Sequence, residues 1–355
     1  MNNLIIIGNG FDLAHELKTS YADFMLWYLN KTRKWLINNL EYEDDICAVK
    51  SFPRNYFLTG DQPFNSISNA FESFKNRNIN IYPKSEFVDG LLKDMRNGYW
   101  VDIEYFYYSH LVSIYRDYER NFSKYDIDAK ASAKSLNRCF SAIISLLEQY
   151  LSTLTIDENK RNPFISKTLK GIIKPERNKN KLVNPPYTLL LNFNYTNTLD
   201  LYAHDLDMSN SRTNVVNIHG LINSEINPVI FGYGDEMDPY YPKLENLNIN
   251  SFLDHIKSFH YLKTTNYLQL MRFVEADPFV IYIMGHSCGL SDRVLLNSIF
   301  EHDKCSNIKI YYHDRKDGSN DYFEKTQEIS RHFKPENKAM MRKKIVPFEK
   351  CSPLT

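Results

Sequence analysis

The stretch LIIIGNGFD, residues 4–12, decides the expected fold of this chain. Residues 4–7 are a short, continuous apolar run, which predicts a buried strand. Gly8 and Gly10 follow at once, and helical periodicity begins soon afterwards, over residues 20–40. The sequence therefore begins with a strand, a glycine turn and a helix, in that order.

Strand-like runs return after residue 186, and several of them are continuously apolar. A continuous apolar run is typical of a strand that helices cover on both faces, because neither face meets water. The runs are residues 187–193, 213–218, 228–231, 279–284 and 308–312, and helical patterns at 249–274, 291–303 and 319–333 supply the crossovers. We therefore predict an α/β fold with a doubly wound, mainly parallel sheet.

A long segment of different character separates the first strand from the others. Residues 41–98 carry several prolines among polar and aromatic residues, so we expect irregular structure with short helices there. Long helical patterns follow at 99–121 and 129–154. The prediction is a sheet domain from residues 1–40 and 186–333, a large, mainly helical insertion at 41–185, and a C-terminal tail at 334–355.

Composition excludes charge-driven binding as the default function. The 43 Lys and Arg residues balance 43 Asp and Glu residues, so no net charge draws the chain to nucleic acid or to an anionic membrane. Basic runs at 157–181 and 342–344 keep nucleic-acid binding as an alternative, although such runs in a neutral protein are usually solvated faces.

Cysteine and histidine spacing predicts no metal site. The five cysteines are scattered without a CxxC pair, and the ten histidines show no HExxH spacing. No apolar stretch approaches the ~18 residues of a membrane span, and the first apolar run is too short for the core of a signal peptide. We therefore expect a cytoplasmic protein without a bound metal and without a membrane partner.

Seven of the 12 glycines lie in four short stretches that each follow an apolar run. At the end of a strand, a missing side chain lets backbone N–H groups approach a phosphate. A tight turn that needs positive φ explains the same glycines equally well. The four stretches are the first candidates for a site, and their glycines are Gly8, Gly10, Gly220, Gly232, Gly234, Gly285 and Gly289.

Polar side chains end two of the predicted strands. The segment LLLNFNYTNTLD, residues 189–200, places Asn192, Asn194 and Thr196 after an apolar run, and VVNIHG, residues 215–220, ends with His219 and Gly220. Ligands of open α/β sheets bind along the carboxyl edge of the strands, where these residues are expected. The alternative is a loop whose amides cap the next helix.

The segment GHSCG, residues 285–289, also fits the GxSxG pattern of a hydrolase, with Ser287 at its centre. Such an elbow needs a strand, a sharp turn and a helix, followed by an Asp and a His. His302, Asp303, His313 and Asp314 are available for those roles. A serine hydrolase is therefore one of the hypotheses.

In its motifs the sequence resembles the bacteriophage abortive infection AbiH family. The resemblance extends from residue 4 to about residue 330. It rests on LIIIGNGFDLAHELKTSYADF at 4–24, WVDIE at 100–104, LNFNYTNTLD at 191–200, NIHG at 217–220, FGYGDE at 231–236 and GHSCGLSD at 285–292.

A more distant resemblance is to the sirtuin-like NAD-binding fold, and it implies a Rossmann-like sheet domain with NAD as ligand or substrate. It implies that Asn194 orients the nicotinamide ribose or a water and that His219 acts as general base. The remaining cofactor contacts that it implies are Gly8, Asn9, Gly10, Phe11, Asp12, Asn192, Thr196, Gly232, Gly234, Gly285, His286 and Ser287.

Two departures from the sirtuin pattern affect this interpretation. Asp12 stands where a serine is usual, and a carboxylate there repels phosphate. The four zinc cysteines of protein-deacylating sirtuins are missing, which argues against peptide deacylation and for an NADase of phage defence.

Three functions therefore remain. The leading hypothesis is an abortive-infection effector that binds NAD or a related nucleotide and hydrolyses its N-glycosidic bond. The alternatives are a non-catalytic nucleotide-sensing or interaction protein of phage defence, and a hydrolase that uses Ser287. A phage-derived trigger and assembly into a homo-oligomer are both compatible with the sequence. Nucleic acid is not favoured as a partner.

Overall fold

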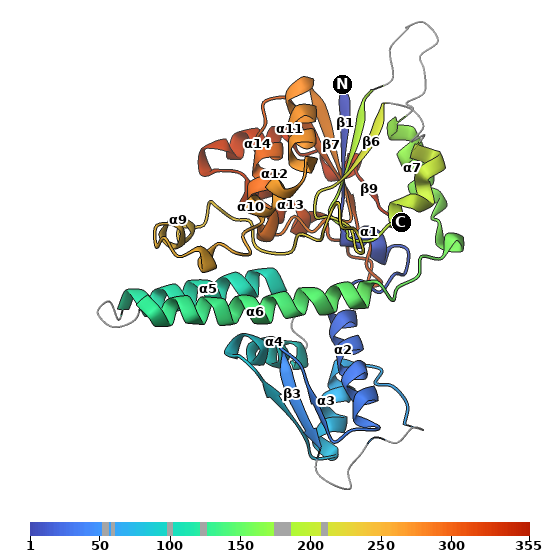
Figure 1. Ribbon diagram of the computed structural model, residues 1–355. Coiled ribbons are helices and arrows are strands. Elements are labelled where there is room, and N and C mark those ends of the chain that lie inside the picture. Colours follow the sequence, from blue (N-terminus) through green and yellow to red (C-terminus); the bar gives the residue numbers. More distant parts are fainter. Residues whose placement is uncertain (52–56, 58–60, 98–101, 121–125, 174–185, 207–211) are drawn as a thin grey trace, which may run out of the picture. The chain divides into compact units, whose positions relative to one another are not determined.

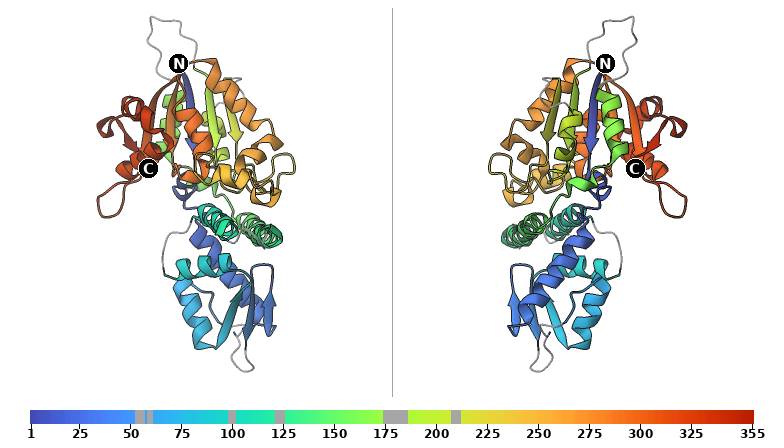
Figure 2. Two further views of the ribbon diagram at one scale, coloured as in Figure 1. Left: turned by 90° about the vertical axis from the view of Figure 1, so that its left-hand side faces the viewer. Right: turned by 90° about the vertical axis from the view of Figure 1, so that its right-hand side faces the viewer.

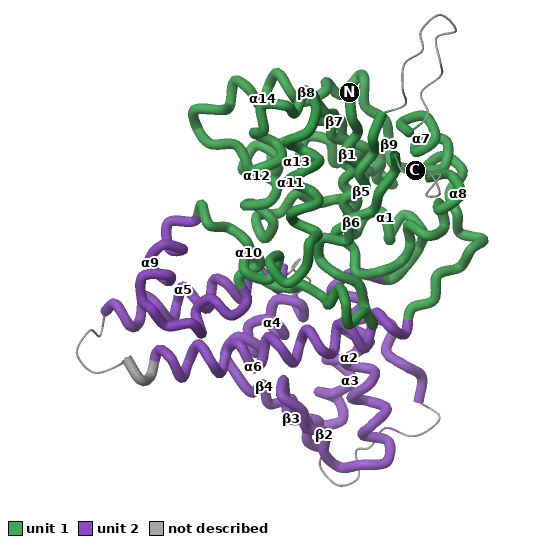
Figure 3. Tube along the Cα trace, turned by 45° about the horizontal axis from the view of Figure 1, so that its top comes forward, with its two compact units in different colours: residues 1–18, 154–237, 256–355 green, residues 19–153, 238–255 purple. Residues whose placement is uncertain are grey.

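The computed structural model describes residues 1–51, 57, 61–97, 102–120, 126–173, 186–206 and 212–355. The chain forms two units, and each is built from separate segments. Unit 1 comprises residues 1–18, 154–237 and 256–355, and unit 2 comprises residues 19–153 and 238–255 (Figure 3).

Unit 1 contains a six-stranded sheet in which every pair of neighbouring strands is parallel (Figure 1). The strand order is β6-β5-β1-β7-β8-β9. The strands are β1 (Asn2–Ile7), β5 (Thr188–Asn192), β6 (Thr213–Asn217), β7 (Phe279–Met284), β8 (Cys305–Tyr312) and β9 (Ser352–Pro353). The predicted parallel α/β sheet is confirmed, and the first strand lies inside it, between β5 and β7.

Helices cover both faces of this sheet (Figure 2). Leu4 and Ile6 of β1 face one apolar core, whereas Ile5 and Ile7 face the other, because successive strand residues point to opposite faces. Each such side chain contributes ~1.5–3 kcal/mol on burial. The first core includes α11 (Asn266–Ala276), α12 (Arg293–Phe300), α13 (Tyr322–His332) and α14 (Lys338–Lys344), and the second includes α1 (Asn9–Leu13), α7 (Pro163–Ile173), η2 (Thr198–Tyr202) and α8 (Ala203–Leu206).

The strand predicted at 228–231 does not form. Pro228 has no N–H, and the main-chain hydrogen bond that the run makes is from Ile230 N to His219 O, at 2.8 Å. The sheet also gains a strand that the patterns did not predict, because the two residues of β9 are too few to show any periodicity.

The helix predicted at 249–274 is divided into short pieces. Thr264 is extended, with φ −133° and ψ 173°, and so interrupts the helical path before α11 begins. The pieces before α11 are η3 (Asn250–Phe252), which belongs to unit 2, and α10 (Lys257–His260) and η4 (Tyr261–Lys263), which belong to unit 1. Besides η2 and η4, the described part of unit 1 has the 3-10 turns η1 (Glu158–Lys160), η5 (Leu290–Asp292), η6 (Pro335–Asn337) and η7 (Phe348–Lys350).

Unit 2 combines helices with a small antiparallel sheet in the order β2-β3-β4. The short helices expected at 41–98 are confirmed at Ile67–Asn76 and Glu86–Arg96, but the rest of the range is not irregular throughout: three strands of three to five residues also form there. Its elements are α2 (Tyr21–Leu36), β2 (Glu41–Glu43), β3 (Cys47–Ser51), α3 (Ile67–Asn76), β4 (Ile79–Pro83), α4 (Glu86–Arg96), α5 (Ile103–Arg120), α6 (Asp126–Leu151) and α9 (Tyr241–Glu245).

Residues 238–255 leave unit 1 and pack within unit 2. Near the start of this excursion, Tyr108 Oη donates to Asp238 Oδ1 at 2.8 Å. Near its end, Asn137 Nδ2 donates to Ser251 O at 2.7 Å and to Asp254 Oδ2 at 2.8 Å. Both ends of the excursion are therefore fixed in unit 2 by side chains of its long helices.

Throughout the described ranges, each helix is either too short or too polar to cross a lipid bilayer.

Candidate functional site

Two glycine turns meet at the carboxyl ends of β1 and β7. Gly10 N donates to Gly285 O at 2.8 Å, and a Cβ on Gly8 would lie only 2.5 Å from His286 Cα. Gly285 has φ +74°, and a Cβ there would lie 2.2 Å from Phe11 N. The close approach of two backbones, as well as the positive φ, explains why these positions are glycine.

The side chain of Phe11 points away from these turns. It is buried in the second core, with its ring centroid 4.8 Å from that of His15 and 5.7 Å from that of Tyr202. Asn9, by contrast, is exposed. Of the two, only the side chain of Asn9 lies at the surface.

The buried carboxylate of Asp12 organises the polar residues that follow β5. Its Oδ2 accepts from Thr196 Oγ1 at 2.6 Å, and its Oδ1 accepts from Asn194 Nδ2 at 3.0 Å. Burial raises the pKa of Asp12 to about 6, while the hydrogen bonds from Thr196, Thr198 and Asn194 act in the opposite direction. Both carboxylate oxygens of Asp12 thus face protein donors.

Asn194 is held with its amide protons directed into the protein. Nδ2 donates both to Asp12 Oδ1 and to Gly8 O, the latter at 3.1 Å. Its Oδ1 has no hydrogen-bond partner among the described residues. Asn192, in contrast, is used structurally: its Nδ2 donates to Asn217 Oδ1 and its Oδ1 accepts from Asn194 N.

A second buried cluster joins His219, Asp292 and Lys257. Asp292 Oδ1 lies 2.8 Å from Lys257 Nζ and 3.1 Å from His219 Nε2. Burial acts to raise the pKa of Asp292, but the Lys257 ammonium and His219 hold it well below 3.8. The carboxylate is therefore ionised and paired inside the protein.

Both ring nitrogens of His219 face protein groups. One side of the ring bonds the backbone of Phe193, and Nε2 faces Asp292 and also Tyr261 Oη, at 3.3 Å. Burial and the Lys257 charge lower the pKa of His219, so its neutral form prevails at pH 7. Protonation would allow the ring to donate to Phe193 and to Asp292 at the same time, so Asp292 stabilises a proton that His219 takes up.

His286 lies beside the same carboxylate in a fixed tautomer. Its Nδ1 accepts from Cys288 N at 2.9 Å, so the ring proton is on Nε2, 3.6 Å from Asp292 Oδ2. The Phe193 ring contacts both histidines, with centroid distances of 4.2 Å to His286 and 4.9 Å to His219. Burial lowers the pKa of His286 to about 3.

The segment FGYGDE, residues 231–236, packs against the segment that carries Asp292. Val294 N donates to Gly234 O at 3.0 Å, and a Cβ on Gly234 would lie 2.9 Å from Ser291 O. Arg293 Nη1 donates to Asp235 Oδ2 at 3.0 Å. Gly232 is buried in the same segment, so the third and fourth glycine stretches lie together.

Ser287 does not have the surroundings of a nucleophile. It is exposed, and within the described part of the chain it makes no hydrogen bond to a histidine or to any other group. The strand β7 is followed by a loop and by η5, and α12 begins only at Arg293. The strand, turn and helix of a nucleophile elbow are therefore not formed.

Two residues of the site were not among the predicted ones: Lys257 and Arg293. Asp292 and Asp235 stand in the quoted motifs GHSCGLSD and FGYGDE, after apolar runs. Lys257 gave no such signal, because a lysine within a predicted helix, here 249–274, is normally solvated. Of the WVDIE motif, residues 100 and 101 lie outside the described residues, and Glu104 is buried in unit 2.

No group of three or more His, Cys, Asp or Glu side chains suited to a metal ion occurs within the described ranges. Asp292, beside His219 and His286, pairs with the Lys257 ammonium.

A comparison with models of known protein families matches the part of the chain in which these motifs lie. The family model described as Bacteriophage abortive infection AbiH matches residues 4–314, which include every motif that forms the two clusters. A search of curated protein sequences gave no match.

Proposed function

Because the chain belongs to the bacteriophage abortive infection AbiH family, we propose that it is an effector that binds NAD or a related nucleotide and hydrolyses its N-glycosidic bond. Membership of the family indicates a role in abortive infection of bacteriophage. The nucleotide and its cleavage are the proposal, and the site at the carboxyl ends of β1, β5 and β7 supports them.

The topology of the sheet supports a nucleotide ligand. Numbered in chain order, the strands read 3-2-1-4-5-6, which is the order of Rossmann-like, doubly wound sheets. Ligands of such sheets bind at the carboxyl edge where the order reverses. In this chain the order reverses between β1 and β7, and the interlocked glycine turns lie at the ends of these two strands.

The observation that carries the proposal is the fixed orientation of Asn194. Since its amide protons are bound to Asp12 and Gly8, its Oδ1 is oriented to accept a hydrogen bond from a ribose hydroxyl or from a water. His219 lies at the end of the neighbouring strand β6, with Asp292 placed to stabilise its protonated form.

The proposed reaction needs few groups because nicotinamide is already a cationic leaving group. The C–N bond breaks with its electron pair moving to the nicotinamide nitrogen, and a water oxygen forms the new bond at C1′ of the ribose. The water proton passes to His219, and ADP-ribose and nicotinamide are released. Asn194 positions the oxygen, and the buried charges of the site act on an oxocarbenium-like state.

The test is to incubate the purified full chain with NAD, with and without a phage lysate, and to follow nicotinamide release by chromatography. We expect Asn194→Ala and His219→Ala to lower the rate ~10²–10⁴-fold, whereas the control Lys316→Gln, at an exposed position that belongs to neither buried cluster, leaves it unchanged. Unchanged release in both site variants would contradict the assigned roles. Release that Ser287→Ala abolishes, with fluorophosphonate labelling of the wild type, would favour the serine hydrolase.

One observation favours a second function, a nucleotide sensor without turnover. Both ring nitrogens of His219 face protein groups, the backbone of Phe193 and the carboxylate of Asp292. His219 would have to give up one of these contacts before it could accept a proton from a water. Calorimetric binding of NAD that depends on Asn194, with no nicotinamide released under any trigger, would establish the sensor instead of the hydrolase.

A further inference from the structure

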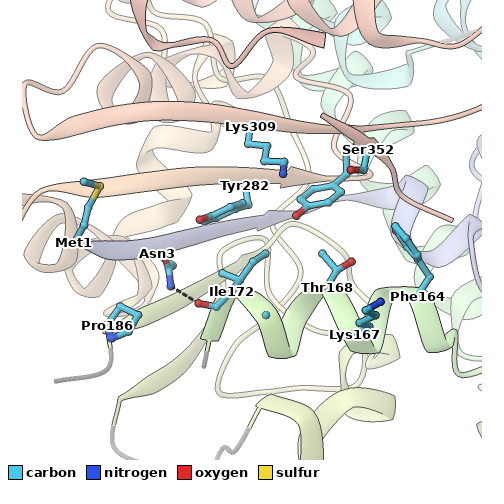
Figure 4. Close-up of a pocket in the computed structure, with 12 residues that line it drawn as sticks. Met1, Asn3, Phe164, Lys167, Thr168, Ile172, Pro186, Tyr282, Lys309 and Ser352 are labelled. Carbon is cyan, nitrogen blue, oxygen red and sulfur yellow. Dashed lines mark hydrogen bonds between the residues drawn. The ribbon is translucent and has the colours of Figure 1, made fainter. Parts of the chain in front are cut away.

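A hollow of about 610 Å³ lies beside the sheet of unit 1, away from the strand ends just described (Figure 4). One wall is the helix α7, and the other is formed by β1, β7, β8 and β9. None of its lining residues belongs to the Asp12 or the Asp292 cluster. Its volume falls within the ~300–1,000 Å³ of small-molecule sites.

Two tyrosine side chains from the sheet line this hollow: Tyr282 of β7, labelled in Figure 4, and Tyr311 of β8. Both belong to the apolar core on one face of the sheet, and Tyr282 is paired with Lys309 of β8. Their hydroxyl groups have no hydrogen-bond partner among the described residues. Burial raises the pKa of both phenols, so both hydroxyls remain protonated donors at neutral pH.

Two lysines also line the hollow, one from each wall. Lys309 comes from β8, with Nζ 5.4 Å from the centroid of the Tyr311 ring, and Lys167 comes from α7 (Figure 4). Within the described ranges neither lysine forms an ion pair, and no Asp or Glu lines the hollow. The positive charge is thus uncompensated by the described protein groups.

We propose that this hollow binds a phosphorylated small molecule of mononucleotide size. A phosphate monoester carries nearly two negative charges at neutral pH, which matches two ammonium groups, whereas a carboxylate would match only one. The phosphate oxygens accept from Lys309, Tyr282 and Tyr311, and lysine binds phosphate as a point charge. The apolar walls formed by Phe164 and Ile172 receive the rest of the ligand.

This site goes beyond the proposed nucleotide hydrolysis, because it lies on a face of the sheet and shares no residue with the strand-end clusters. The two sites can therefore be separated by mutation. Asn194→Ala alters the strand-end site alone, and Lys309→Gln alters the hollow alone.

The experiment is calorimetric titration of the full chain with AMP, adenosine and inorganic phosphate. We expect AMP to bind more tightly than either of the other probes. Lys309→Gln and Lys167→Gln should each weaken AMP binding roughly tenfold, because each removes one charge-assisted contact. The exposed Lys316→Gln is the charge-matched control and should leave AMP binding unchanged.

Circular dichroism of each variant controls for folding. No AMP binding at millimolar concentration would overturn the proposal, as would binding that survives both lysine substitutions. Loss of AMP binding in Asn194→Ala would assign the ligand to the strand ends instead, and inorganic phosphate binding as tightly as AMP would exclude a ligand of mononucleotide size. Nicotinamide release is a separate measurement, so failure of the hydrolase proposal would leave this titration interpretable.

Discussion

Lys257 Nζ lies 2.8 Å from Asp292 Oδ1, and neither side chain is more than 9% exposed. The two residues are 35 positions apart, and the chain between them includes α11 and β7. The pair places one negative and one positive charge beside His219 and His286. This ion pair, which the sequence patterns did not reveal, sets the charge of the site.

The ion pair should show strong energetic coupling. Lys257→Met or Asp292→Asn alone leaves a buried charge without its partner, which costs ~3–5 kcal/mol. The double variant should lose less than the sum of the two single variants, because no unpaired charge remains. Hydrogen exchange of the β1 and β7 amides measures the loss of stability of unit 1 in each variant. Additive losses would show that the pair is not coupled.

Tryptophan fluorescence is unsuitable for that measurement. Trp27 and Trp35 belong to unit 2, and Trp100 lies outside the described residues. Fluorescence of Trp27 and Trp35 would therefore report on unit 2, whereas the site lies in unit 1.

Asp12 should make the stability of the protein depend on pH. Its pKa is raised from 3.8 to about 6 in the folded state, so the folded chain binds more protons than the unfolded chain between these values. The stability of the wild type then falls as pH rises through this window, by about 3 kcal/mol in total from this group.

The matched variant Asp12→Asn cannot titrate. Its free energy of unfolding, minus that of the wild type, should increase from pH 4 to pH 6 and stay level above. Hydrogen exchange or chemical denaturation at a series of pH values measures the difference. A difference that is constant with pH would mean that Asp12 keeps an ordinary pKa.

Gly8 should be intolerant of a methyl group. In Gly8→Ala the new Cβ meets the His286 backbone at 2.5 Å, so we expect a loss of ~1–3 kcal/mol or more together with weaker nucleotide binding. Gly171→Ala is the control, because a Cβ there has open space within α7. That change should stabilise by ~0.5–1 kcal/mol, since alanine is the better helix residue. Thermal unfolding followed by circular dichroism compares the two variants, and equal effects would contradict the close approach at Gly8.

Asn137 should fix the end of the excursion in unit 2. Asn137→Ala removes the hydrogen bonds to Ser251 O and Asp254, and it leaves the hydroxyl of Tyr107 without its acceptor. We expect a loss of ~1–3 kcal/mol and faster hydrogen exchange at residues 249–255. Exchange in β5, which lies in unit 1, is the internal reference. Unchanged exchange at 249–255 would show that other contacts hold the segment.

Local patterns predicted the sheet well where the strands are continuous buried apolar runs, as in β1, β5 and β7. They failed for β2 and β9, because two or three residues cannot establish a period, and for β3 and β4, whose apolar residues are mixed with polar ones. They also predicted a strand at 228–231, where Pro228 cannot donate to a ladder. Continuity of the apolar run and the presence of backbone donors separate the two outcomes.

The sequence by itself determined the parallel α/β sheet, the family, and the glycine turns with Asn194 and His219 at the strand ends. These features follow from apolar runs and motifs, which depend only on residues that are close together in the sequence. Only the tertiary structure decided that Asp12 faces Asn194 and Thr196, and that Lys257 pairs with Asp292. These contacts join residues that lie 35 to 184 positions apart, and such pairings depend on how strands and loops pack in space, which no local pattern encodes.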